Sequence, residues 1–74
     1  MSLEQAREMV GLSARQIGCL RGKAAGKNNK EIGVELGVGA STVAAELYVV
    51  RCMLGVKNTA AAISVGYRDG WLKG

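Results

Sequence analysis

The side chains best suited to bind an anion are concentrated in one part of this 74-residue chain. The ten residues from Arg21 to Lys30 carry four positive charges and no acid, and the whole chain has a net charge of +4. Ammonium and guanidinium groups clustered in this way bind phosphate, whose charge they neutralise. The candidate phosphate ligands are Lys23, Lys27, Lys30, Arg51 and Lys57. For Lys23 and Arg51, a plain solvated side chain explains the sequence equally well.

Residues that would support catalysis or a metal site are missing from the sequence. The chain has no histidine, and its two cysteines, Cys19 and Cys52, lie far apart. A structural zinc site needs four ligands, usually Cys and His, so we expect neither a metal nor a cofactor. The stretch "GKNNK" lacks the Gly-x4-Gly-Lys-Ser/Thr spacing of a phosphate-binding loop. We therefore expect the protein not to be an enzyme.

The sequence also predicts where the protein works. The N-terminal residues are polar and charged and lack the apolar segment of a secretion signal. No apolar run in the sequence reaches membrane-spanning length. Two cysteines without a disulfide spacing suit a reducing compartment. These features predict a cytoplasmic protein with no membrane partner.

The elements that must position the charged residues are predicted to be helices. Eleven glycines and no proline indicate short helices separated by glycine turns. We expect an all-α fold, a small bundle of four to five helices, with a short N-terminal helical extension over residues 1–11 and one domain over residues 12–74. The helices of the domain are predicted within residues 12–26, 28–38, 40–55 and 57–70. Their predicted caps are Ser13, either Asn28 or Asn29, and Thr59, with Gly26, Gly55 and Gly70 at the ends.

Two of these helices have the spacing of a helix-turn-helix. Helices that pack at a steep angle need a small residue at their crossing, which Gly33 supplies. The turn four positions later needs a residue that tolerates positive φ, and Gly37 supplies it. The inner faces are completed by apolar residues, namely Ile32, Leu36, Val38 and Val43. This arrangement favours DNA binding over a generic helical interaction module.

Four stretches of the sequence match the pattern of a known protein family. They are "LSARQIGCL", "AAGKNNKEIGVELGV", "STVAAEL" with "MLGVKN", and "AAAI" with "GWL". Together they resemble the LuxR/GerE-type helix-turn-helix domain, the four-helix DNA-binding output domain of many bacterial regulators, over residues 12–72. Region 4 of sigma factors has a similar helix-turn-helix but lacks the last two stretches.

The resemblance implies a role for particular positions. The helix matching residues 41–54 enters the major groove in that family, and the helix matching residues 59–68 mediates dimerisation. The implied DNA-binding residues are Lys27, Lys30, Ser41, Thr42, Ala45, Glu46, Val49, Lys57 and Asn58. The implied dimer interface is Ala62, Ile63, Gly66 and Tyr67.

The groove-facing helix departs from the family pattern. Ala44 stands where a basic residue is usual, and Glu46 stands where a histidine is frequent. Glu46 either accepts a hydrogen bond from a cytosine amino group or lies in solvent. The usual cap is replaced by Gly39, so Ser41 is a candidate for a later start of the helix. Ala45 and Val49 offer apolar contacts to thymine methyl groups.

Two functions are consistent with these features. The first is a small standalone transcriptional regulator that binds double-stranded DNA as a homodimer and is nucleoid-associated when bound. The second is a protein-binding anti-activator or co-regulator that pairs with a larger transcription factor. The second depends on the apolar, uncharged character of the long helix, to which Val49, Cys52 and Met53 contribute.

Overall fold

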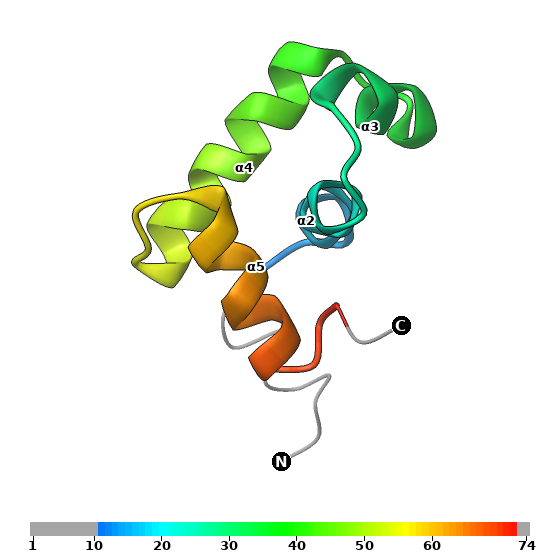
Figure 1. The fold of residues 1–74 in the computed structure, drawn as a ribbon. Coiled ribbons are helices and arrows are strands. Elements are labelled where there is room, and N and C mark those ends of the chain that lie inside the picture. The colour runs from blue at the N-terminus through cyan, green and yellow to red at the C-terminus, as the bar shows by residue number, and fades with distance from the viewer. Residues whose placement is uncertain (1–10, 73–74) are drawn as a thin grey trace.

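The computed structural model describes residues 11–72, which fold into four helices and no strand. In Figure 1 they follow one another as α2 (Ala14–Ala24), α3 (Asn29–Leu36), α4 (Ala40–Leu54) and α5 (Thr59–Arg68). The all-α prediction is confirmed. The predicted N-terminal extension, apart from Gly11, lies outside the described residues.

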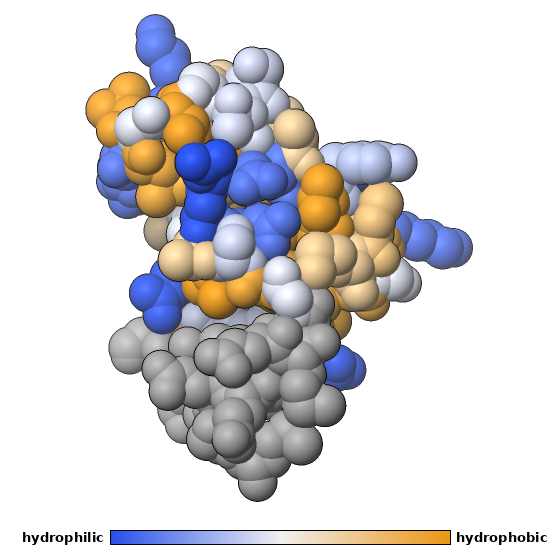
Figure 2. Space-filling model, turned by 180° about the vertical axis from the view of Figure 1, so that it is seen from behind, coloured by the Kyte–Doolittle hydropathy of each residue, from blue (hydrophilic) through white to orange (hydrophobic). Residues whose placement is uncertain are grey.

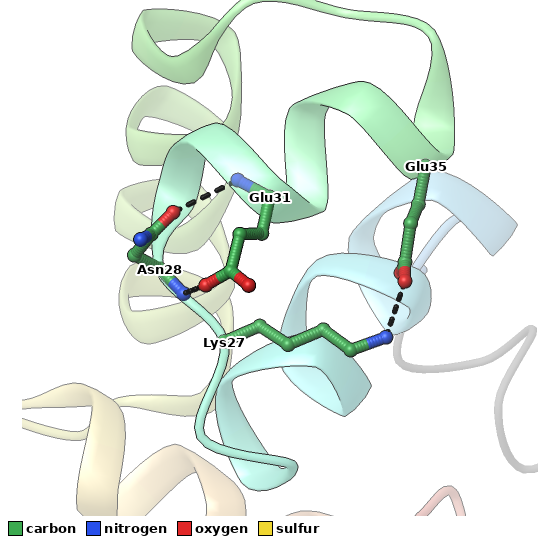
Figure 3. Close-up of polar contacts among 4 residues, drawn as sticks. All are labelled: Lys27, Asn28, Glu31 and Glu35. Atoms are coloured by element: carbon green, nitrogen blue, oxygen red, sulfur yellow. Dashed lines mark hydrogen bonds and ion pairs between the residues drawn. The ribbon is translucent and has the colours of Figure 1, made fainter.

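The first two helices begin with reciprocal capping boxes. The Ser13 hydroxyl accepts a hydrogen bond from the Gln16 amide at 3.1 Å, and the Gln16 side chain accepts one from the Ser13 amide at 2.9 Å. Asn28 and Glu31 repeat this exchange at the start of α3 (Figure 3). Each box satisfies two backbone N–H groups that a helix start leaves unpaired. Ser13 is therefore confirmed as a cap, and Asn28 is the cap of α3.

The start of α5 differs from the prediction by one residue, whereas α4 begins where the predicted range 40–55 places it. Helix α5 is capped by Asn58, whose side-chain oxygen accepts a hydrogen bond from the Ala61 amide at 2.8 Å, while Thr59 is the first helical residue. Helix α4 is capped by Gly39 and begins at Ala40, so a later start at Ser41 is wrong. The extended backbone of Asn58 and Gly39 defines them as caps, because residues inside a helix have helical dihedrals.

One apolar core joins the four helices. Helix α4 contributes Val43, Leu47 and Val50 to it, at the i, i+4 and i+7 spacing that places residues on one face of a helix. Leu36 was expected on the inner face, but it is 36% exposed. It stands at the last position of α3 and lies against Gly18 of α2 rather than in the core. The buried apolar residues are Leu12, Cys19, Leu20, Ile32, Val43, Leu47, Val50, Ala62, Trp71 and Leu72.

Helices α3 and α4 meet at 99° across the short connection 37–39. Gly37 adopts φ 72°, the left-handed conformation that glycine accepts without a steric penalty. A methyl group at Gly33 would come within 2.5 Å of the Val38 carbonyl oxygen, so only glycine permits this close approach. Both predicted glycine roles are confirmed, and the angle is that of a helix-turn-helix.

The same pair of helices has an apolar composition. Within residues 11–72, no single helix is long and apolar enough to cross a membrane, although α3 and α4 taken together reach that length and composition despite the 99° bend between them.

Candidate nucleic-acid interface

Helix α4 presents one continuous exposed face opposite its buried stripe. Side chains three and four positions apart share a face of a helix, and the exposed positions of α4 follow that spacing. Tyr48 is 60% exposed and Val49 is 38% exposed. We call this surface the outer face of α4; it consists of Ser41, Ala44, Ala45, Tyr48, Val49 and Cys52. Three of the predicted groove-facing residues, Ser41, Ala45 and Val49, lie on it.

Tyr48 is a member of the outer face that the sequence interpretation did not select. Its ring is the largest group on the face, and the guanidinium carbon of Arg51 lies 5.6 Å from the ring centroid. A guanidinium over an aromatic ring is attracted by the negative π face. Arg51 is therefore held against Tyr48 rather than projecting freely into solvent. The helical period from Ser41 through Ala44 and Ala45 leads to Tyr48 and would have identified it.

Glu46 and Thr42 lie off the outer face. Both are half-buried, and Glu46 stands on the flank of α4 near Cys19 of α2. Burial, and then the negative charge of Glu46, raise the pKa of the Cys19 thiol, while Arg15 lowers it. This position of Glu46 argues against a contact between its carboxylate and a base. Thr42 remains placed for a phosphate contact from the side of the helix.

The three lysines that the resemblance implies as DNA-binding residues have different surroundings, whereas the fourth candidate, Lys23, is half-buried on α2. Lys30 is exposed in the first turn of α3, and Lys57 is exposed in the connection that follows α4. Neither has an ion-pair partner among residues 11–72. The ammonium group of Lys27 instead forms an ion pair with Glu35 at the end of α3 (Figure 3). Of these three lysines, Lys30 before α4 and Lys57 after it therefore carry charge that no carboxylate among residues 11–72 pairs with.

Asn58 has a structural role next to Lys57. Its side-chain oxygen caps α5, whereas its side-chain NH2 group makes no hydrogen bond within the described part of the chain. The residue is exposed, so the NH2 group remains able to donate to a phosphate. Capping therefore holds Asn58 in position without excluding its predicted contact.

Two of the four residues predicted to form the dimer interface point toward the core of their own protomer. Ala62 and Gly66 are buried, and a methyl group at Gly66 would come within 2.7 Å of a Leu72 methyl carbon. They pack against the chain's own core and cannot touch a second copy. Tyr67 is 57% exposed, and Ile63 is half-buried at the edge of the core. Of the four predicted dimer residues, only Ile63 and Tyr67 therefore expose side chains that a second copy could contact.

Taken together, these features define a class of protein. Two helices meet at 99° through a short glycine turn, and the second exposes one face along its length. This is a helix-turn-helix domain, in which the second helix is the one that enters the major groove.

The family profile of the bacterial regulatory proteins of the luxR family matches residues 10–65, which is more than half of the chain. The chain belongs to that family of DNA-binding transcription regulators, which are not enzymes as a class. No curated protein and no solved structure matches the chain. The resemblance predicted from the sequence is thereby confirmed.

Proposed function

We propose that the protein regulates transcription in the bacterial cytoplasm by binding double-stranded DNA as a homodimer. In this proposal the outer face of α4 enters the major groove, and Lys30 and Lys57 contact the phosphates on either side. The observation that carries it is the exposed outer face of α4 in a helix-turn-helix whose angle is 99°. A major groove about 12 Å wide admits one α-helix.

The side chains of the outer face suit close approach to DNA. Ser41, Ala44 and Ala45 are small and exposed in the first half of α4, the part of a recognition helix that contacts base edges. Thr42, Lys27 and Asn58 supply further contacts to the backbone from neighbouring positions. Phosphate contacts set register and affinity, whereas the outer face meets the bases.

Salt dependence tests the lysine contacts. For binding to mixed-sequence duplex fragments, we expect Lys30→Ala and Lys57→Ala each to reduce the slope of log affinity against log salt by about two units in a dimer, because each lost phosphate contact is worth about one. The control is Arg68→Ala, which removes an exposed charge that pairs with Asp69. The measurement is fluorescence anisotropy across a salt series. An unchanged slope in both lysine variants would contradict these contacts.

Sedimentation tests the dimer. In the proposed homodimer, α5 of one copy packs on α5 of the other through Ile63 and Tyr67. We expect Tyr67→Asp to shift the protein toward monomer, because the interface would bury an unpaired carboxylate. The matched control is Tyr48→Asp, which makes the same change at an equally exposed tyrosine of α4. Equal association by the two variants would place the interface elsewhere than on α5.

One observation favours a second function, pairing with a larger transcription factor. Exposed apolar side chains gather on the C-terminal half of α4, where Val49 and Met53 are 38% and 41% exposed. Figure 2 shows apolar residues, coloured orange and pale orange, at the surface on the right of the view. Apolar surface of this kind suits a protein partner. An absence of binding to duplex DNA at low salt would favour this function over the first.

A further inference from the structure

The outer face of α4 lacks the groups that recognise three of the four bases. Guanine is read by Arg or Lys, adenine by Asn or Gln, and cytosine by Asp or Glu. None of these residue types occurs among Ser41, Ala44, Ala45, Tyr48, Val49 and Cys52. The nearest carboxylate, that of Glu46, lies on the flank beside α2. What the face offers is the methyl groups of Ala44, Ala45 and Val49, the phenol ring of Tyr48, the thiol of Cys52 and the hydroxyl of Ser41.

We propose that α4 reads thymine by its C5-methyl group, through Ala44, Ala45 and Tyr48, and that it takes no readout from guanine. This inference rests on the proposed DNA-binding function and specifies the base that the recognition helix selects. The thymine methyl is the apolar feature of the major-groove edge, and apolar side chains are its natural partners. Burying it removes apolar surface from water on both sides of the contact.

The geometry places these three side chains together. Ala44 and Ala45 are adjacent and exposed, and Tyr48 follows one turn later on the same face. Ala44 and Tyr48 are separated by about 6 Å along the helix axis, close to two base-pair steps. The short alanine side chains let the helix backbone approach the floor of the groove. The longer Tyr48 side chain then reaches the C5-methyl group of a second thymine farther along the groove.

Arg51 supports the position of Tyr48. Its guanidinium carbon lies 5.6 Å from the ring centroid, on the turn of α4 beyond Tyr48. A cation over one face of the ring restricts its rotation, and the opposite face of the ring stays available for a contact. Tyr48 is therefore a specificity-determining residue, and Arg51 is a positioning residue that acts through it.

The test replaces thymine with dU, which lacks only the methyl group. A duplex selected by the wild-type protein from a random-sequence pool is resynthesised with dU at each thymine. Burial of one methyl-sized group is worth about fourfold in affinity, so losing the two methyl contacts of each protomer, four in a dimer, weakens binding by about 200-fold. At a thymine position changed to cytosine, 5-methylcytosine is expected to recover part of the lost affinity. Equal affinity for the dT and dU duplexes overturns the inference and leaves the DNA-binding function intact. If no duplex in the pool is bound, it is the proposed function that fails.

Two variants assign the effect to the outer face. Tyr48→Ala is expected to lower the ratio of affinities for the dT and dU duplexes by about fifteenfold, because it removes one methyl contact from each protomer of the dimer. Val34→Ala, at an exposed apolar residue of α3 that lies in neither the outer face nor the proposed dimer interface, is expected to leave that ratio unchanged. Circular dichroism establishes that both variants are folded. A ratio that changes equally in both variants, or in neither, refutes the assignment to Tyr48.

Discussion

Replacing Gly33 with alanine is expected to lower the free energy of unfolding by about 3 kcal/mol. The added methyl would stand 2.5 Å from the carbonyl oxygen of Val38 and 3.3 Å from the carbonyl carbon of Gly39. Both atoms belong to the backbone, so no side-chain rotation relieves the clash and α3 must move away from α4. A domain of this size has roughly 4 to 11 kcal/mol of stability in total, so the loss is a large share.

Two neighbouring glycines provide graded controls for Gly33→Ala. Gly37 has φ 72° but open space around it, so Gly37→Ala is expected to cost only the left-handed strain of about 1 kcal/mol. Gly39 has φ −77° and caps α4 without a side chain, so Gly39→Ser is expected to stay within about 0.5 kcal/mol of the wild type. Urea denaturation followed by circular dichroism measures all three. Unfolding of Gly33→Ala at the wild-type urea concentration would contradict the close helix crossing.

The scaffold was predictable because its constraints fall on single residues. Gly33 and Gly37 meet steric and dihedral demands that few other residues satisfy, and the core stripe of α4 repeats at a helical period. The capping residues were harder to predict, because two neighbouring residues can both have side chains suited to the cap position. Asn58 and Thr59 are adjacent and both suitable, and only the extended backbone of Asn58 decides between them.

The candidate site was less predictable because a sequence does not show which side of a helix the rest of the chain covers. Ala62 and Gly66 are small, and small residues suit a dimer interface as well as an internal helix crossing. In the structure Trp71 and Leu72 fold back onto the core, and Leu72 packs against Gly66, so these small residues serve an internal contact. For Glu46 the sequence left two alternatives, a base contact or a solvated side chain, because a sequence does not show that this flank of α4 is half-buried.

Replacing Trp71 with alanine is expected to cost about 3–5 kcal/mol, enough to leave the protein largely unfolded at 25 °C if its stability is at the lower end for its size. Trp71 is 1% exposed and belongs to the core that joins the four helices. Its amide donates a hydrogen bond to the Gly66 carbonyl at 2.8 Å, and its carbonyl accepts one from the Arg21 side chain at 3.4 Å. The large side chain leaves a cavity that such a small core cannot fill by rearrangement.

The consequence extends from the core to α5. Leu72 packs against Gly66 on the inner side of α5, so loss of the Trp71 anchor is expected to free the helix that carries Ile63 and Tyr67. Trp71→Phe keeps most of the apolar volume and is expected to retain the fold and the dimer at a cost of about 1–2 kcal/mol. Thermal unfolding by circular dichroism and sedimentation compare the two variants. Because the family match ends at residue 65, a wild-type melting temperature in Trp71→Ala would show that the match alone contains the stable domain. A large loss would show that residues 71–72 are part of it, and a monomeric Trp71→Ala beside a dimeric wild type would show that the proposed dimer also depends on their packing.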